Sequence, residues 1–531
     1  MPNPISGART HDRLLARLSR RELLNIAWKL GLAAVTPAIV PGRVWAQMAF
    51  TDYPFALGVA SGDPLPQGVV LWTRLAPKPL QGGGMPMANI EVLWEIARER
   101  AFRTIVQKGA SIARPELGHS VHVEVEGLEP EREYFYRFRA GREVSQIGRT
   151  KTAPVAGAVV KELRFGVCGC SHYEEGHFTA FRRIAQEQFD FVFHTGDYIY
   201  EARASGGAAE RVRQHEGQEI YTLVDYRNRY AQYKCDPHLM AAHASAPFVM
   251  TWDDHEVDND YAGNRDEQDT PPEVFLLRRA AAFQAYWESM PLRKAQFPAG
   301  PDLRLYRRLQ FGNLLDLSVL DTRQYRSDQV CGETGKPDCP ARVDPSRTML
   351  GPAQERWLFD NLGTARARWT LIGQQVPTFA RDFGPEAATR FSSDKWDGYA
   401  AGRDRLFARL QDTKAPNPIV LSGDVHVHFG ADLKRDFAKP ESATVGVEFT
   451  NTSITSGGDG AEASASWDQL RRTNPHLKYH SARRGYISCT ATQTTMRADF
   501  KVLDRVTVAD QPARIGGSLV VESGRPGSVL A

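Results

Sequence analysis

Cysteine, surplus charge and long apolar runs are all scarce in this sequence. Its 531 residues include only 6 cysteines, too few for a disulfide-based scaffold, and no paired Cys-x-x-Cys motifs indicate a zinc site. The 66 basic and 63 acidic residues leave a formal net charge of only +3. A dedicated nucleic-acid-binding protein usually has a strong basic excess, and an acidic disordered scaffold has the reverse. The composition excludes both classes, so we predict no stable complex with nucleic acid.

Apolar residues are abundant enough for a large core. Hydrophobic residues make up 42% of the chain and aromatic residues 10%. At roughly 100–200 residues per domain, the length predicts two to three domains.

The N-terminal segment resembles a twin-arginine export signal. Residues 19–24 read SRRELL, a moderately apolar run follows, and residues 44–46 (VWA) have small residues, Val44 and Ala46, at the positions that a signal peptidase needs. The alternative is an ordinary amphipathic helix with a basic first turn. We predict that residues 1–46 engage the twin-arginine (Tat) export machinery, which makes the product periplasmic or secreted.

A transmembrane anchor is not expected. Lys29 interrupts the N-terminal apolar run, and Pro37 and Pro41 end it short of the ~20 apolar residues that a membrane span needs. Cleavage after Ala46 removes seven basic and two acidic residues, which leaves 59 basic and 61 acidic residues. The mature chain then carries a formal charge of −2, so the basic excess belongs to the export signal.

Cys331 and Cys339 flank a short polar loop, CGETGKPDC. In an oxidising compartment a disulfide closes such a loop, whereas in a reducing one both thiols stay free. The sequence alone leaves both states open.

Closely spaced short strands are predicted between residues 55 and 152. Apolar residues alternate with polar ones over residues 121–125, which is typical of a half-buried strand. Residues 127–130 (GLEP) followed by Tyr134 resemble the tyrosine corner of a fibronectin type III domain. We therefore predict a fibronectin III-like β-sandwich over residues 47–155.

An α/β domain is predicted over residues 160–510, after a small-residue linker at 152–160. Apolar runs such as FDFVFHTGD and PIVLSGDVH alternate with helical stretches such as GPAQERWLFDNL. Strands with few polar residues are usually covered on both faces. Residues 511–531 are expected to form a C-terminal tail.

Metal-binding residue types follow four of the predicted strands. The four clusters are Cys168–Cys170, Asp197–Tyr200, Asp253–Glu256 and Asp424–His428. Any one cluster is also explained by turn capping, but the carboxyl ends of strands converge on one crevice in an open α/β sheet. Carboxylates with imidazole, thiolate or phenolate suit iron together with an oxygen-preferring divalent ion.

Several motifs together resemble the alkaline phosphatase D (PhoD) family of calcineurin-like metallophosphatases. They are GVASGDPLPQGVVLWTRL, GDYIYE, WDDHEVDNDYAGN, LDTRQYR, LIGQQVP and SGDVHVHF, and the resemblance extends from about residue 55 to about residue 505. It implies an αββα metallophosphatase domain that holds ferric iron (Fe3+) with calcium (Ca2+), or another divalent ion, as its companion.

The resemblance also implies the ligands on the iron side. Cys170 matches the family's thiolate ligand, Asp197 the carboxylate that bridges the metals, and Tyr200 the phenolate ligand. Cys168 has the same side-chain parity as Cys170, and its alternative role is that of a buried structural thiol.

The remaining ligands come from the third and fourth clusters. Asp254 lies where related metallophosphatases have an asparagine ligand, and Asn259 is a competing candidate. Asp424 and His426 match the last metal-binding strand end. His428 shares the parity of His426, and three roles stay open for it: metal ligand, phosphate contact, or support for the ligands.

Two residues are expected to act on the substrate. His255 lies where related enzymes direct an imidazole at the leaving group, and its alternative is a structural histidine. Arg323, which follows an apolar strand, is expected to bind phosphate oxygens, and its alternative is a structural salt bridge with a nearby aspartate.

The predicted function is an exported, metal-dependent phosphate ester hydrolase of the alkaline phosphatase D type. A metal-activated hydroxide would release inorganic phosphate, and no G-x-S-x-G motif indicates a nucleophilic serine. One alternative keeps the same site in a phosphodiesterase or phospholipase D-like enzyme. Another is a cell-surface interaction protein whose catalytic domain is inactive.

Overall fold

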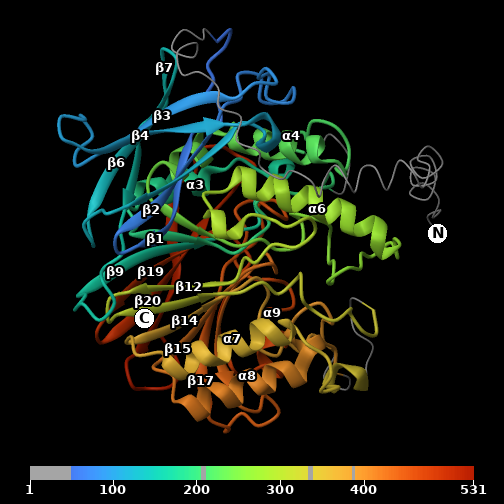
Figure 1. Ribbon diagram of the computed structural model, residues 1–531. Coiled ribbons are helices and arrows are strands. Elements are labelled where there is room, and N and C mark those ends of the chain that lie inside the picture. Colours follow the sequence, from blue (N-terminus) through green and yellow to red (C-terminus); the bar gives the residue numbers. More distant parts are fainter. Residues whose placement is uncertain (1–49, 205–210, 333–338, 385–388) are drawn as a thin grey trace.

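A computed structural model describes residues 50–204, 211–332, 339–384 and 389–531 (Figure 1). The predicted export signal at residues 1–46 therefore lies outside the described residues. Within these ranges, the helices are all too short or too polar to span a bilayer.

Two large sheets form the centre of the molecule. The first has ten strands in the order β22 (Val529–Leu530), β21 (Ala513–Glu522), β20 (Thr495–Leu503), β19 (Arg484–Thr492), β9 (Glu162–Cys168), β10 (Phe191–His194), β11 (Pro247–Met250), β1 (Val59–Leu65), β2 (Gly68–Arg74) and β5 (Ser120–Glu126). The second has seven strands in the order β12 (Arg307–Phe311), β13 (Leu315–Val319), β14 (Trp369–Gly373), β15 (Pro418–Ser422), β17 (Thr444–Thr450), β16 (His428–Lys434) and β18 (Leu477–Ser481).

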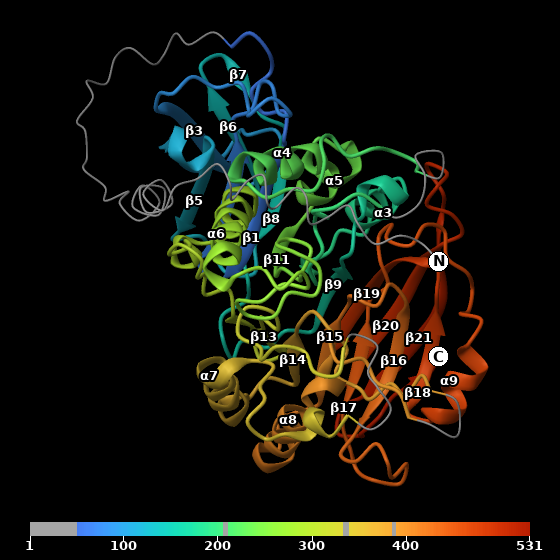
Figure 2. The ribbon, with the colours of Figure 1, turned by 90° about the vertical axis from the view of Figure 1, so that its right-hand side faces the viewer.

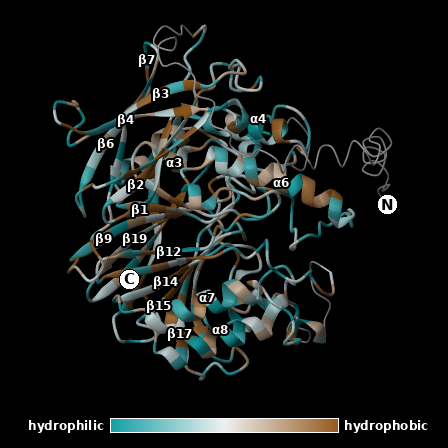
Figure 3. Ribbon diagram, in the orientation of Figure 1, coloured by the Kyte–Doolittle hydropathy of each residue, from teal (hydrophilic) through white to brown (hydrophobic). Residues whose placement is uncertain are grey.

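The two sheets pack face to face. Phe165 and Phe193 of the first sheet share a buried core with Leu317, Leu371 and Ile419 of the second. Burial of such apolar surface is the main stabilising contribution to a domain of this size. Figure 3 shows hydrophobic residues concentrated in these central strands.

Helices cover the outer faces of both sheets. On the ten-stranded sheet these are α3 (Thr179–Gln186), α4 (Leu223–Lys234), α5 (Pro237–His243) and α6 (Pro272–Ser289). On the seven-stranded sheet they are α7 (Gly351–Thr364), α8 (Ala400–Thr413) and α9 (Trp467–Thr473). The layers therefore run helix, sheet, sheet, helix, and the α/β prediction is confirmed.

The N-terminal region is joined to this core more closely than the sequence predicted. β1 pairs in parallel with β11, and β2 and β5 extend the same ten-stranded sheet. A third sheet of β4 (Ile105–Ala113), β3 (Ile90–Ala97), β6 (Glu133–Ala140), β7 (Glu143–Val144) and β8 (Gly148–Lys151) packs against these strands. Figure 2 shows it at the end of the molecule opposite α7 and α8.

The expected tyrosine corner is present in that third sheet. The Tyr134 hydroxyl accepts a hydrogen bond from the Glu129 backbone N–H at 3.0 Å. One layer of the expected sandwich is part of the ten-stranded sheet. The region's likeness to fibronectin type III stays a prediction.

The prediction of a C-terminal tail at residues 511–531 is wrong. β21 pairs with β20 along its length and buries Leu519 and Val521 in the core between the sheets. Two glycines obscure its alternation in the sequence, and at Gly517 a Cβ atom would lie 2.3 Å from the Tyr479 ring. Glycine is needed at this position because the Tyr479 ring packs so closely against the backbone of β21.

The bond between Cys331 and Cys339 is formed, with their Cα atoms 6.1 Å apart. Of the two states that the sequence left open, the structure has the disulfide. The loop therefore has the covalent closure expected in an oxidising compartment.

Candidate metal centre

The four predicted clusters meet between the two large sheets. β9, β10 and β11 are parallel neighbours, so Cys170, Asp197 and Asp254 follow adjacent strand ends, and Asp424 follows β15 of the facing sheet. Three groups of residues could each hold a metal ion, because within each group the ligand atoms all lie within 4.8 Å of one another. The groups are Cys170, Asp197 and His426; Asp197, Asp254 and His255; and Asp253, Asp254 and Asp424.

Left-handed backbone at four of these residues turns their side chains into the site. The φ angles are 56° at Cys170, 53° at Asp197, 68° at Asp424 and 54° at His426. Non-glycine residues adopt this left-handed region rarely and mainly at functional sites, because the conformation costs about 1–3 kcal/mol for each residue. Such a conformation persists only where the surrounding contacts enforce it.

Glu256 provides one such set of contacts. Its buried carboxylate accepts backbone hydrogen bonds from Asp197 at 3.1 Å, Tyr198 at 2.6 Å and Asp253 at 2.8 Å. Burial raises the pKa of Glu256 to about 8. This side chain therefore ties together the loops that follow β10 and β11.

One half of the site combines a thiol, a phenol and an imidazole. The Tyr200 oxygen lies 3.0 Å from Asp197 Oδ2, 3.1 Å from His426 Nε2 and 2.6 Å from Ser456 Oγ. Burial and the nearby carboxylates raise the pKa of Cys170 and of Tyr200 well above their usual values. Burial lowers the pKa of His426 to about 3, which leaves the neutral imidazole that metals bind.

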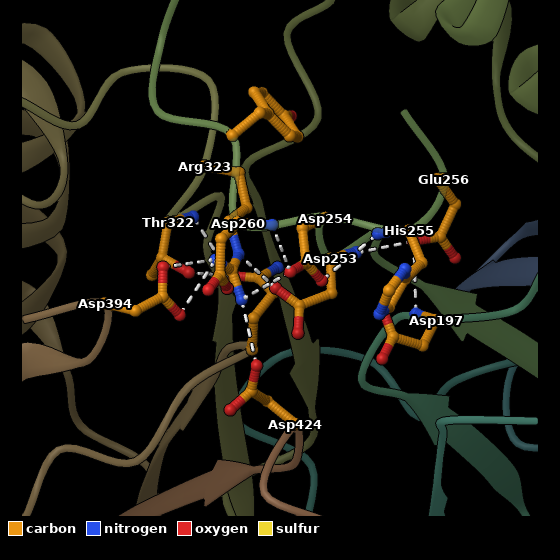
Figure 4. Close-up of polar contacts among 12 residues, drawn as sticks. Asp197, Asp253, Asp254, His255, Glu256, Asp260, Thr322, Arg323, Asp394 and Asp424 are labelled. Atoms are coloured by element: carbon orange, nitrogen blue, oxygen red, sulfur yellow. Dashed lines mark hydrogen bonds and ion pairs between the residues drawn. The ribbon is translucent and has the colours of Figure 1, made fainter. Parts of the chain in front are cut away.

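The other half is a cluster of carboxylates around Arg323 (Figure 4). This fully buried guanidinium lies 2.9 Å from Asp394 and 3.0 Å from Asp424, and its Nε donates to Asp253. Burial acts to raise the pKa of Asp254, but the charges of Arg323, His255 and Lys395 together outweigh it and hold that pKa below its usual value. The N–H donors of Arg323 face carboxylates, which are the contacts expected of a structural salt bridge rather than of a phosphate-binding residue.

The residues of both halves fit bound cations. Asp197 Oδ1 and Asp253 Oδ2 are buried without a hydrogen-bond donor anywhere in the described ranges. Burial raises the pKa of both carboxyl groups well above the usual value. A buried charge is stable only when it is paired or binds a metal, and a metal also deprotonates a thiol that coordinates it.

His255 is held by a carboxylate that the sequence analysis did not single out. Glu201 Oε2 lies 2.7 Å from His255 Nδ1, and Glu201 Oε1 accepts the Asn259 backbone N–H at 2.9 Å. Burial acts to lower the pKa of His255, but Glu201, Asp197 and Asp254 together raise it well above the usual value. The GDYIYE motif contains Glu201, yet nothing in its spacing indicated a partner 54 residues away.

The two competing ligand candidates have different surroundings. Asp254 belongs to two of the three groups, whereas the Asn259 side-chain amide donates to Glu267 at 2.7 Å. Cys168 packs in the core under the helices.

His428 lies outside the three groups as well. Its Nδ1 accepts the Thr452 backbone N–H at 3.2 Å, and Thr452 Oγ1 donates to the carbonyl of His426 at 3.0 Å. His428 therefore supports the loop that fixes His426.

Comparison with known proteins identifies the family. Residues 165–500 match the PhoD-like phosphatase family, and residues 42–154 match the N-terminal domain of PhoD-like phosphatases. The chain belongs to the PhoD-like phosphatase family. The resemblance seen in the sequence motifs is thereby confirmed, and the chain is a phosphate ester hydrolase.

Individual relatives agree with this assignment. Alkaline phosphatase D of Bacillus subtilis (strain 168) is 46% identical over 514 residues, which cover 96% of this chain and 88% of that protein. A solved structure of PhoD is 48% identical, with a TM-score of 0.89 over 91% of this chain and 93% of that one. A purple acid phosphatase from yellow lupin shares only the fold, with 12% identity and a TM-score of 0.55 over 89% of this chain and 74% of that one.

Proposed function

We propose that this phosphatase is an alkaline phosphatase that uses ferric iron and calcium. Cys170, Asp197, Tyr200 and His426 would hold the iron, and Asp197, Asp254 and Asp424 the calcium. Thiolate and phenolate are ligands typical of ferric iron, and clustered carboxylates are typical of calcium. The observation that carries the proposal is that Asp197 belongs both to the group with Cys170 and His426 and to a group with Asp254, which in turn shares a group with Asp424.

Such metal ions supply a hydroxide at neutral to alkaline pH and neutralise charge on the phosphoryl group. His255 would direct its Nε2 at the leaving-group oxygen, because Nδ1 is engaged by Glu201 at 2.7 Å. Its side chain is 19% exposed, so a substrate can reach it. Arg323 would keep Asp253 and Asp424 in place rather than touch the substrate.

We further propose that the enzyme is periplasmic or secreted. The twin-arginine pattern at residues 19–24 and the disulfide between Cys331 and Cys339 both suit an exported protein. N-terminal sequencing of the exported protein is expected to show cleavage after Ala46. Replacement of Arg20 and Arg21 by lysine is expected to block export, and unchanged export would contradict the pathway.

Metal analysis and a visible absorption spectrum of the purified enzyme test the metals. We expect iron, calcium and a coloured protein, because phenolate and thiolate bound to ferric iron absorb visible light. A colourless zinc protein would refute the assignment of Cys170 and Tyr200. Rates on p-nitrophenyl phosphate, bis-p-nitrophenyl phosphate and phosphatidylcholine measure the preference among monoesters, diesters and phospholipids.

A further inference from the structure

Three cations contact the carboxylates beside the proposed calcium site, and they differ in exposure. The side chains of Arg323 and Arg326 are fully buried, whereas the side chain of Lys395 is 16% exposed. All three contact Asp394, and Lys395 also contacts Asp424. Lys395 is therefore the member of this trio whose side chain reaches solvent.

Lys395 contacts the side of Asp424 that Arg323 leaves open. Arg323 pairs with Asp424 Oδ1 at 3.0 Å, while the Lys395 ammonium pairs with Oδ2. The same ammonium lies 2.6 Å from Asp394 Oδ2. An ammonium has three N–H donors, so these two contacts leave one donor for a ligand at the mouth of the site.

The segment that carries Lys395 is anchored by its neighbours. Trp396 is 1% exposed and donates to Gln374 Oε1 at 2.8 Å, and Asp397 pairs with Arg403 at 2.6 Å. The contacts of Trp396 and Asp397 thus hold the backbone of Lys395 in place, so the Lys395 side chain is not needed for that purpose. A role in folding alone does not account for a lysine whose ammonium lies against a proposed metal ligand.

We propose that Lys395 binds a non-bridging oxygen of the substrate's phosphoryl group and favours monoester dianions over diester monoanions. This inference rests on the proposed function, since it takes Asp424 to be a metal ligand. Lysine acts on phosphate as a point charge. It therefore stabilises a bound dianion more than a monoanion, and it also binds the product, inorganic phosphate.

The test compares Lys395→Met and Lys395→Arg with a control, Gln329→Met, in the full-length enzyme. Gln329 donates to the other oxygen of Asp394 at 3.0 Å but carries no charge. The measurements are kcat and KM on p-nitrophenyl phosphate and on bis-p-nitrophenyl phosphate, inhibition by inorganic phosphate, metal content and Tm.

For Lys395→Met we expect kcat/KM on the monoester to fall roughly 10- to 150-fold, the range for a hydrogen bond to a charged group. The inhibition constant of phosphate should rise by a similar factor, and the diester rate should fall several-fold less. Lys395→Arg should recover most of the loss, and Gln329→Met should change neither substrate's rate.

Equal losses on monoester and diester, unchanged inhibition by phosphate, or loss of metal from Lys395→Met would each overturn the proposal. If Lys395→Met does not fold, Lys395→Gln gives the same comparison. Failure of the proposed function would instead be visible in the wild type, as missing hydrolysis or missing metals, so the two outcomes are distinguishable.

Discussion

Replacement of Glu201 by Gln is expected to reduce kcat roughly 10- to 150-fold while both metals stay bound. Glu201 Oε2 lies 2.7 Å from His255 Nδ1, and Oε1 accepts the Asn259 N–H at 2.9 Å. Gln has the same shape and keeps the second bond. It loses the negative charge that stabilises the imidazolium, and its amide N–H facing Nδ1 favours the neutral ring, whose Nε2 proton is a much weaker acid toward the leaving group.

The magnitude follows from the strength of that contact. A hydrogen bond to a charged group contributes about 1.5–3 kcal/mol, and each 1.36 kcal/mol of activation free energy changes the rate tenfold. The whole 10- to 150-fold reduction appears in kcat when the contact stabilises the transition state more than the bound substrate. We therefore expect kcat to change more than KM. Steady-state kinetics on p-nitrophenyl phosphate, with metal analysis of the same sample, measure both quantities.

Glu267→Gln is the matched control. Glu267 accepts the side-chain amide of Asn259 at 2.7 Å in the same loop, whereas His255 Nδ1 is bonded to Glu201. We expect this control to keep near wild-type kcat. Wild-type turnover in Glu201→Gln, or a loss of metal from it, would refute the positioning role of Glu201.

Three further changes test other parts of the structure. Ser456→Ala removes the hydroxyl 2.6 Å from the Tyr200 oxygen, so the visible band of the iron form should move to longer wavelength. Cys331→Ser opens the loop closed by Cys339, and a lower Tm should reveal a loss of about 2.5 kcal/mol by the chain-entropy relation. Burial raises the pKa of Glu448 from 4.5 to about 7. Its contribution to stability is therefore complete below pH 4.5 and declines as the pH rises through 7, by about 3 kcal/mol. Denaturation at pH 4.5 and pH 8 should show that the free energy of unfolding of wild type, relative to that of Glu448→Gln, is lower at pH 8. The same relative value at both pH values would contradict this role of Glu448.

The sequence predicted which strand ends carry chemistry, but not which side chain at each end enters the site. Cys168 and Cys170 share the parity of a strand, as do His426 and His428. The strand β9 ends at Cys168, however, and β16 begins at His428. Cys170 and His426 adopt left-handed backbone outside those strands. Side-chain alternation applies only within a strand, so parity could not decide between them.

Contacts between distant segments were also beyond the sequence. β1 pairs with β11 across more than 180 residues, which is why the N-terminal strands looked like a module of their own. The proposed roles of Glu201 and Lys395 likewise depend on contacts with distant residues. Glu201 contacts His255, 54 residues away, and Lys395 contacts Asp424, 29 residues away. Local periodicity reports which face of an element is buried. It does not report which other element covers that face.

The two halves of the site differ in how their charge is balanced, and this difference argues for two unlike metals. Asp253 and Asp424 already have Arg323 as a counter-charge, so a weakly polarising divalent ion is enough to complete their coordination. The Arg484 guanidinium interacts with Cys170 and Tyr200, yet burial still raises the pKa of both groups well above their usual values. A bound metal ion would displace both protons. This difference in charge balance supports the proposal of unlike metal ions on the two sides of Asp197.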